Sequence, residues 1–303
     1  MYYYKTIIGI FILDENMNII KEIPFKHIDK YTEEADSKYE PLPEEYHPKI
    51  LELLKQPKYF KGFYENNVAL TKQGIKQSVN EDDLIIQAIS NIEELDKISN
   101  MLTKRLREWY SLYLPELSEN LQHHEKFVEL VLEKSKKELL KELETETMGA
   151  DLSKDDVDEI ILVAKEVNNM YTLRKKHEEY LSRVMEKYCP NVKELCGTTI
   201  GAKLLDLARS LKRLATLPSS TVQLLGAEKA LFRHMKNKSS LSPKYGVIFQ
   251  HPLIQKVERK ARGKAARSLA DKISLCARLD FFKGEFKAPK FREELEQKFV
   301  PYS

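Results

Sequence analysis

The amino-acid sequence predicts a mostly α-helical, multidomain protein in which a long antiparallel coiled-coil hairpin lies between a small α/β domain and a basic helical domain. The chain has 303 residues with only ten glycines, and its apolar residues recur at helical spacing over long stretches. Residues 190–303 contain 23 Lys and Arg against 10 Asp and Glu, whereas residues 1–189 contain 27 against 37. A total charge of +3 therefore conceals a strongly basic C-terminal part. We expect domains at residues 1–85, 86–190 and 191–303.

The N-terminal domain is expected to begin with a β-hairpin. Residues 3–13 and 19–25 are rich in β-branched and aromatic side chains, and a turn-forming stretch separates them. Residues 26–57 are acidic and punctuated by prolines, which predicts short helices and loops, and residues 59–79 complete the domain. Its many acids and tyrosines have two interpretations, a protein-docking face or an ordinary solvated surface.

Apolar residues at spacings of three and four predict three helical runs after Glu81. The first run ends near Pro115, because proline lacks a backbone donor and disfavours helix at the residue before it. The second begins near Ser118 and continues to Leu143, and the third spans residues 157–188. The apolar stripe of the first run consists of Leu84, Ile85, Ala88, Ile92, Leu95, Ile98 and Leu102.

The segment between the second and third runs predicts a helical hairpin. Gly149 can adopt the left-handed conformation that ends a helix, and Ser153 with Asp156 forms a capping-box pattern that starts the next one. We therefore expect these two runs to pair, each arm being about 30 residues and about 45 Å long. Two helices that touch only each other leave apolar surface exposed, so we expect a homodimer. The alternative is a hairpin buried on its own domain.

Composition excludes several classes of protein. Three cysteines are too few for a disulfide framework, which indicates a reducing compartment and cysteines that serve as small core residues. The N-terminal apolar run of about seven residues fits a strand better than a signal peptide. No window approaches the roughly 18 to 20 apolar residues that cross a bilayer. We expect a soluble intracellular protein without membrane contact.

The C-terminal part contains a helix with one basic face. Ser220 to Gln223 forms a second capping-box pattern, and the helix that it opens is expected to bury Leu224, Leu225, Ala227 and Leu231. Gly226, Lys229, Arg233 and Lys236 recur at spacings of three or four and so share a face. A glycine within a helix costs about 0.5 to 1 kcal/mol, which favours a packing or close-approach reason for it. Such cations can bind phosphate oxygens, although a basic face taken alone is more often merely solvated.

Two further segments accompany this helix. Residues 235–244 form a Ser-, Lys- and Pro-containing loop that can close on a ligand, and residues 245–254 are apolar and aromatic. Gln250 in this stretch can hydrogen-bond a base or a backbone group, and His251 has equally supported core and contact interpretations. A last helix is expected over residues 258–280. Its buried stripe is Ala261, Ala265, Leu269, Ile273 and Cys276, and its cations include Arg262, Lys264 and Arg267.

Signatures of enzymes and metal sites are absent from the sequence. The stretch from Gly197 to Lys203 has three residues between its glycines and lacks the Gly-Lys-Ser/Thr ending of a phosphate-binding loop. His123 and His124 are adjacent, so they cannot present two ligands from one helical face, and the spacing of Cys189 and Cys196 exceeds that of a zinc knuckle. We expect no catalytic residue, no metal and no cofactor in this chain.

Three segments together resemble the NOP domain. They read LPSSTVQLLGAEKALFRHMK, YGVIFQHPLI and RGKAARSLADKISLCARLD, and REWYSLYLPEL at residues 107–117 is also similar to that family. The NOP domain is the signature of core scaffold proteins of box C/D guide ribonucleoproteins, and a spliceosomal relative shares it. The order of small domain, hairpin and basic domain matches the archaeal members, and the similarity covers nearly the whole chain.

The resemblance implies a non-catalytic scaffold for RNA-guided 2′-O-methylation of rRNA or tRNA. The N-terminal domain would dock fibrillarin, which uses S-adenosylmethionine, the coiled coil would form a homodimer, and the NOP domain would grip box C/D kink-turn guide RNA bound by a small kink-turn-binding protein. An archaeal protein of this kind would be cytoplasmic and a eukaryotic one nucleolar. The RNA and protein contacts implied by the match are Gly226, Ala227, Glu228, Lys229, Arg233, His234, Lys244, Gln250, His251, Arg262, Lys264 and Arg267.

The sequence also departs from the family pattern. The loop at residues 236–242 and the segment 255–260 do not match it, so the resemblance implies no contacts there. The sequence reaches residue 303 without the long lysine-rich tail typical of the eukaryotic nucleolar members, so we expect an archaeal type and favour the spliceosomal relative less. The alternative is a splicing-type NOP protein that binds a kink-turn small nuclear RNA without fibrillarin. A third reading, an unrecognised nuclease or transferase, lacks any reactive constellation.

Overall fold

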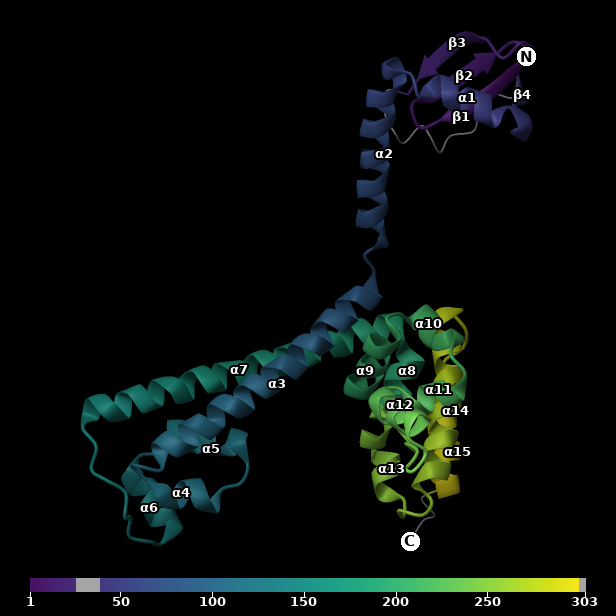
Figure 1. The fold of residues 1–303 in the computed structure, drawn as a ribbon. Coiled ribbons are helices and arrows are strands. Elements are labelled where there is room, and N and C mark those ends of the chain that lie inside the picture. The colour runs from purple at the N-terminus through teal and green to yellow at the C-terminus, as the bar shows by residue number, and fades with distance from the viewer. Residues whose placement is uncertain (26–38, 300–303) are drawn as a thin grey trace. The chain divides into compact units, whose positions relative to one another are not determined.

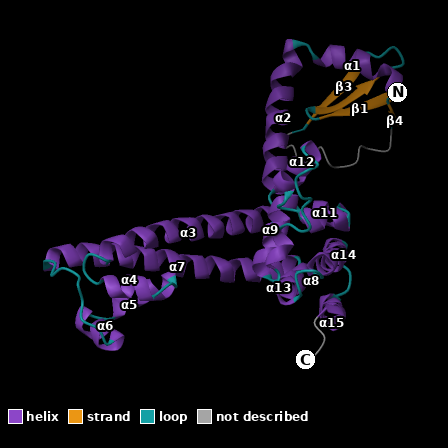
Figure 2. Cartoon of the chain, turned by 60° about the horizontal axis from the view of Figure 1, so that its bottom comes forward, coloured by secondary structure: helices purple, strands orange, loops and turns teal. Residues whose placement is uncertain are grey.

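The computed structural model describes residues 1–25 and 39–299, and its contacts divide the chain into two compact units, Met1–Asn80 and Glu81–Ser303. Helices dominate, and the strands shown in Figure 2 belong to the first unit, which confirms the predicted fold class. The expected domain boundaries at residues 85 and 190 stay predictions. Part of the stretch expected to form short helices and loops, residues 26–38, lies outside the described residues.

The first unit contains a four-stranded sheet in the order β3-β2-β1-β4. Antiparallel pairing joins β1 to β2 and β2 to β3, and β4 is parallel to β1. A small core forms where Phe11 and Leu13 of the sheet meet Ile50 and Leu54. The elements are β1 (Tyr2–Thr6), β2 (Gly9–Leu13), β3 (Ile19–Pro24), β4 (Glu40–Pro41), a short 3₁₀ helix (Glu44–Tyr46), α1 (His47–Leu54) and α2 (Pro57–Ser78).

The expected β-hairpin is present as β2 and β3, but the single strand predicted over residues 3–13 was wrong. The chain reverses between Thr6 and Gly9, so this stretch supplies two strands. The Thr6 hydroxyl donates to the Gly9 carbonyl at 3.1 Å and accepts from the Ile8 amide at 3.3 Å. The Thr6 side chain therefore stabilises this turn. The sequence did not indicate the turn, because its residues Ile7 and Ile8 are typical of a strand.

The long helical hairpin of the second unit has different arms from those predicted. Helices α3 (Glu81–Tyr110) and α7 (Lys154–Tyr188) pair along their length, as Figure 1 shows. The second predicted run is broken, because Ser135 and Glu138 form a reciprocal capping box that starts a new helix within it. Three short helices replace it, namely α4 (Pro115–Asn120), α5 (His124–Glu133) and α6 (Lys136–Leu143).

The buried face of α3 is also rotated from the predicted one. Leu84 and Ile98 were placed in the apolar stripe but are 45% and 41% exposed. Ser99 and Thr103 are fully buried instead, and each hydroxyl donates to the carbonyl four residues earlier. The Thr103 hydroxyl also lies 3.0 Å from the Tyr171 hydroxyl of α7. Hydroxyl groups that are hydrogen-bonded can therefore be buried, and a prediction based only on the spacing of apolar residues does not identify such positions.

Gly149 does not end a helix in the left-handed conformation, which corrects the prediction. The preceding helix ends at Leu143, and Glu144 has the positive φ of 52°. A Cβ on Gly149 would lie 2.2 Å from the Tyr113 carbonyl oxygen, so glycine is required for close packing. The other half of the expectation is confirmed, because the Ser153 hydroxyl accepts from the Asp156 amide at the start of α7.

The C-terminal helices share one apolar core with the base of the hairpin. Helix α14 lies at its centre and packs against α8, α10, α11 and α15. No helix in the described part of the chain is long and apolar enough to cross a membrane. The bounds are α8 (Pro190–Cys196), α9 (Thr198–Ala208), α10 (Leu211–Thr216), α11 (Ser219–Leu224), α12 (Glu228–Lys236), a 3₁₀ helix (Val247–Gln250), α13 (Pro252–Lys256), α14 (Arg262–Phe281) and α15 (Ala288–Phe299).

Buried polar side chains fasten these helices together. Asp280 at the end of α14 accepts hydrogen bonds from the backbone and side-chain nitrogens of Asn191 and from the Val192 amide, at 2.8 to 3.0 Å. The side-chain oxygen Oδ1 of Asn191 in turn accepts from the Lys287 and Ala288 amides at the start of α15. One asparagine and one aspartate therefore fix the ends of three helices.

Candidate nucleic-acid interface

The predicted basic helix is interrupted, and two separate helices take its place. Helix α11 ends at Leu224 and α12 begins at Glu228, and Gly226 between them has φ +85°. Its prediction as a mid-helix glycine was wrong, and so was the capping box at Ser220, because no side chain caps α11. A Cβ on Gly226 would lie 2.6 Å from the Val247 side chain. Both its conformation and its contact require glycine.

Residues 246–247 hold this break in place. The Gly246 amide donates to the Gln223 carbonyl and the Val247 amide to the Leu225 carbonyl, at 2.9 and 2.8 Å. On the other side of the break, the Glu228 carboxylate accepts from the Gly226 amide at 2.7 Å. A carboxylate is stabilised at the start of a helix, where amides lack partners. Ala227 is the residue that precedes α12, so the break sets the direction of that helix.

Helix α12 presents its cations on a surface that the other described residues of the second unit leave uncovered. It has no buried residue, and Lys229, Arg233 and Lys236 are all exposed at the predicted spacing. Within the described residues, none of the three has a carboxylate within ion-pair distance. Phe232 and Met235 beside them are 64% and 66% exposed. We call these three cations and two apolar side chains the α12 face.

The segment after α12 folds back on it. His234 Nδ1 donates to the Ser240 carbonyl at 2.6 Å, so His234 holds the loop against α12. Its side chain is therefore not part of the α12 face. The Lys244 carbonyl accepts from the Gln223 side chain at 2.6 Å. A Cβ on Gly263 would lie 3.9 Å from the Lys244 side chain, which places Lys244 at the start of α14.

The two polar residues of the aromatic segment have different positions. Gln250 is exposed, whereas His251 is 8% exposed and hydrogen-bonds with both ring nitrogens. His251 Nε2 donates to the Leu195 carbonyl at 2.9 Å, and Nδ1 accepts from the Leu253 amide at 3.2 Å. Burial lowers the pKa of His251. The structure therefore supports the core interpretation of His251, since no ring nitrogen is left for a ligand.

The last predicted cations lie at the start of α14. This helix begins at Arg262 rather than at residue 258, and Ala261 precedes it and is only partly buried, outside the core. Arg262 Nε donates to the Val257 carbonyl at 3.0 Å, and its guanidinium lies 5.7 Å from the centre of the Phe249 ring. Arg262 is thus engaged within the protein, while Lys264 and Arg267 are exposed.

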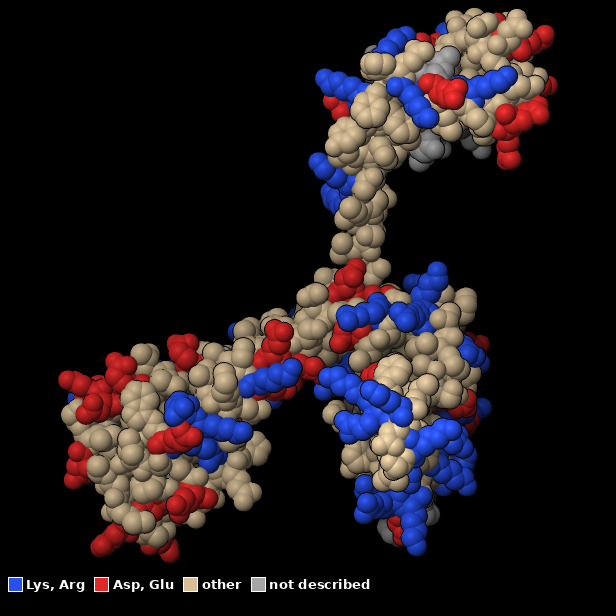
Figure 3. Space-filling view, in the orientation of Figure 1, with Lys and Arg blue, Asp and Glu red and all other residues tan. Residues whose placement is uncertain are grey.

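Together these contacts bring most of the predicted residues to one region. Residues 244–250 lie between the break at Gly226 and the start of α14, because Val247 contacts the first and Lys244 the second. Lys and Arg side chains cover much of the visible face of the C-terminal helices in Figure 3.

The sequence analysis did not predict the exposed Phe232 and Met235 or the buried Asn191. Their signal was an apolar residue on the polar side of a helix and a polar residue in an apolar stretch.

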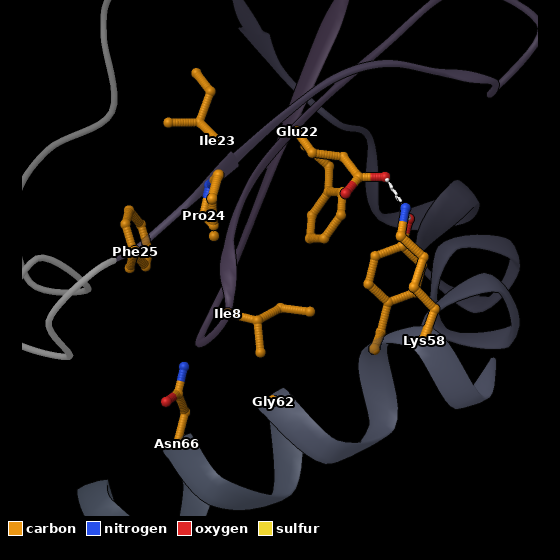
Figure 4. Close-up of a pocket in the computed structure, with 11 residues that line it drawn as sticks. Ile8, Glu22, Ile23, Pro24, Phe25, Lys58, Gly62 and Asn66 are labelled. Atoms are coloured by element: carbon orange, nitrogen blue, oxygen red, sulfur yellow. Dashed lines mark hydrogen bonds and ion pairs between the residues drawn. The ribbon is translucent and has the colours of Figure 1, made fainter.

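A separate pocket of about 310 Å³ lies in the first unit, between β3 and α2. Figure 4 shows apolar side chains such as Ile8 and Ile23 along it and an ion pair at its edge. Lys58 Nζ lies 2.9 Å from a Glu22 oxygen that also accepts from the Tyr59 hydroxyl. These hydrogen bonds lower the pKa of the Glu22 carboxyl group, and the bond from Tyr59 contributes more than the bond from Lys58.

The described residues do not assemble a reactive centre around these sites. No group of three His, Cys, Asp or Glu among them can hold a metal ion. The cysteines Cys189, Cys196 and Cys276 are buried and free, and burial raises the pKa of each thiol, to about 12 for Cys276. A buried thiol with a raised pKa is a poor nucleophile.

A sequence model of the Nop family, described as “snoRNA binding domain, fibrillarin”, matches residues 91–300. The chain belongs to the Nop family. An uncharacterised NOP5 family protein of Methanocaldococcus jannaschii is 39% identical over 247 residues, which are 76% of this chain and 59% of that protein. Nucleolar protein 56 of Schizosaccharomyces pombe is 38% identical over 231 residues, 69% of this chain and 46% of that protein.

Other Nop-family relatives agree with these two. Nucleolar protein 58 of Schizosaccharomyces pombe is 35% identical over 230 residues, 70% of this chain and 45% of that protein. The chain thus spans about half the length of the curated relatives that it matches. A chain from a crystal structure of a fibrillarin/Nop5p complex aligns with 97% of this chain and 99% of its own length, at 24% identity and a TM-score of 0.47.

Proposed function

We propose that this Nop-family chain is a non-catalytic scaffold of a box C/D guide ribonucleoprotein. It bridges fibrillarin to kink-turn guide RNA bound by a small kink-turn-binding protein, and so enables RNA-guided 2′-O-methylation of rRNA or tRNA. The α12 face is the observation that carries the proposal, since its cations are exposed, unpaired within the described chain and inside the region of the family match. Phosphate binding by such cations is salt-dependent.

The α12 face also suits a joint surface of RNA and protein. Its cations are suited to phosphate oxygens, and the exposed Phe232 and Met235 are suited to an apolar protein surface, which we propose the small kink-turn-binding protein supplies. Paired RNA keeps its base faces stacked within the stems, so without the small protein these two apolar side chains would stay in water. Assembly of the RNA with that small protein before capture by α12 is therefore part of the proposal.

An apolar groove of the first unit is proposed to dock fibrillarin. The groove of about 450 Å³ lies between α1 and α2, where Leu51, Phe60 and Phe63 are exposed. Exposed apolar side chains that line one groove are typical of protein-binding surfaces. The methyl donor, S-adenosylmethionine, then belongs to fibrillarin, and this chain contributes no cofactor.

The hairpin is proposed to form a homodimer. Its outward side chains include Met101, Leu162 and Leu173, which are 64%, 51% and 43% exposed on α3 and α7. Covering them requires a second helical surface. Light scattering at micromolar concentration should give twice the monomer mass, and a monomer would contradict this part of the proposal.

The localisation is also a proposal. Eukaryotic relatives are named nucleolar proteins, and we place an archaeal chain of this kind in the cytoplasm.

Reconstitution tests the function as a whole. The chain, fibrillarin, the small kink-turn-binding protein and a guide RNA should together transfer methyl groups from S-adenosylmethionine to a matched ribose. The chain alone should transfer none. Recovery of kink-turn RNA without fibrillarin would instead support a splicing-type protein, and turnover by the isolated chain would contradict the scaffold role.

A matched pair of aromatic residues separates the two docking surfaces. Phe60 in the first unit and Phe232 on α12 are 63% and 64% exposed, so a glutamate at either position should leave folding intact. Phe60→Glu should abolish fibrillarin capture and leave capture of the RNA complex unchanged. Phe232→Glu should do the reverse. Equal effects of both variants on both partners would contradict the assignment.

A further inference from the structure

The turn between α14 and α15 exposes two aromatic rings that no part of the proposed function uses. Residues 282–287 are all exposed, with Phe282 at 74% and Phe286 at 56%. This turn lies at the C-terminal end of α14, whereas Arg262 lies at the other end, which a 20-residue helix puts about 30 Å away. The turn is therefore a different surface from the α12 face and its neighbours.

The backbone of this turn is fixed although its side chains are exposed. Asn191 donates to the Glu285 carbonyl and accepts from the Lys287 amide, and Asp280 holds Asn191 in place. The Gly284 amide donates to the Leu279 carbonyl at 2.7 Å. A surface that is already ordered loses little conformational entropy when a ligand binds.

Cations accompany the two rings. Lys283 has φ +56° and no carboxylate partner within the described chain, whereas Lys287 pairs with Glu285 at 2.9 Å. Lys290 follows in the first turn of α15 and is exposed. The left-handed conformation of Lys283 is uncommon for a residue with a side chain, so the turn maintains it at an energetic cost.

Helix α10 adds cations to the same end. The Ala215 carbonyl accepts from Arg278 Nε at 3.1 Å and the Leu217 carbonyl from the Ser274 hydroxyl at 3.3 Å, so α10 runs antiparallel to α14. This register places Lys212, which is exposed, beside the end of α14. The acidic start of α3 bounds the patch, since Asp82 accepts from the Leu211 amide.

We propose that this turn is a second RNA contact, which takes single-stranded nucleotides. Phe282 and Phe286 offer faces on which bases stack, and Lys283, Lys290 and Lys212 meet the phosphates. Aromatic side chains beside cations are the usual platform for single strands, which expose the faces of their bases. A protein partner would leave these cations without phosphates. The site goes beyond the proposed function, because it requires neither a kink-turn nor a second protein.

Fluorescence anisotropy of the full chain with a labelled oligouridine of about ten nucleotides tests this contact. The experiment uses the Lys229→Ala/Arg233→Ala background, so that the α12 face does not mask the turn. Adding Phe282→Leu/Phe286→Leu should weaken binding roughly tenfold, because stacking is lost while apolar volume is kept. Phe282→Trp/Phe286→Trp should retain it. Lys283→Gln should reduce the salt slope by about 0.7.

Tyr64→Leu is the matched control, since the aromatic side chain of Tyr64 is 61% exposed, lies in the other unit and does not line the proposed fibrillarin groove. An unchanged affinity in the double leucine variant would overturn the proposal, as would a loss that tryptophan fails to restore or that Tyr64→Leu reproduces. Photo-crosslinking of a thiouridine oligonucleotide to the unaltered chain avoids any folding defect and should label residues 282–287. Labels found only elsewhere would also overturn it. Either failure leaves kink-turn capture by α12 intact, so the two proposals are tested separately.

Discussion

Helices α12 and α14 have similar basic sequences, and the protein uses them in opposite ways. Helix α14 buries nine of its residues and occupies the centre of the C-terminal core, whereas α12 buries none. The cations of α14 decorate the solvent side of a core helix, while those of α12 belong to a helix held mainly at its first residues. A count of lysines and arginines cannot distinguish these cases. The difference lies in what each helix buries, and so in which property a substitution should change.

The largest expected effect is on stability and comes from α14. Asp280→Asn places an amide NH₂ group among the three N–H donors that the carboxylate accepts from. Buried donors left without an acceptor should lower the free energy of unfolding by about 3 kcal/mol. Urea unfolding measures this loss. Glu285→Gln, in the exposed turn nearby, is the control and should change little. An Asp280→Asn protein of unaltered stability would remove the basis for treating this end of α14 as a structural anchor.

The second effect is on binding and comes from α12. Lys229→Ala/Arg233→Ala should weaken capture of the kink-turn RNA–protein complex about thirtyfold and reduce the salt slope by about two. The free energy of unfolding should stay within about 0.5 kcal/mol, because neither side chain is buried. Fibrillarin capture should not change. Lys264→Ala/Arg267→Ala makes the same charge change on α14. Undiminished capture by the α12 variant would show that the α12 face is only a solvated surface.

A third and smaller effect concerns the break that directs α12. Gly226→Ala forces a side chain into a φ of +85° and against Val247. We expect a loss of about 1 kcal/mol in the free energy of unfolding, together with weaker RNA capture. Gly74→Ala, in an open position of α2, provides a control that should be neutral or stabilising. If Gly226→Ala lowered stability without any effect on capture, the break would not orient the α12 face.

The smallest effect is a pH dependence within the core. Burial lowers the pKa of His251 below its ordinary value of 6.5, so the unfolded chain takes up a proton at a higher pH than the folded one. Stability should therefore fall as the pH drops from about 7 to about 5. Asn at position 251 removes this titration, and thermal unfolding of His251→Asn at both pH values should show a flatter profile. The same slope in both proteins would assign the pH dependence to other groups.

Periodicity predicted the fold class, because long helices such as α3 and α7 repeat their apolar spacing many times. Residue charge and spacing predicted the basic C-terminal part and the cations of α12. The arms of the hairpin were misassigned because one capping box, at Ser135, outweighs the apolar spacing around it. The same holds for the turn secured by Thr6 and the break at Gly226. In each case a single hydrogen bond or a single φ angle decides the path of the chain, and averages over a window do not register it.

Burial was harder to predict than helix formation. Ser99, Thr103 and Asn191 are buried through hydrogen bonds whose partners are distant in sequence or one turn earlier in the helix. For His251 the sequence left two interpretations open, and only the Leu195 carbonyl on another helix distinguishes them. Such partners are known once the helices have been brought together, which is information that residue spacing does not contain.

The 35 residues of α7 also make the hairpin a ruler. At about 1.5 Å per residue this helix measures roughly 52 Å, a fixed distance between the short helices at one end and the basic domain at the other. Inserting seven residues into each arm would add about 10 Å while keeping nearly the same helical faces in contact. Any two partners held at the opposite ends of the hairpin would then be moved apart by about that length.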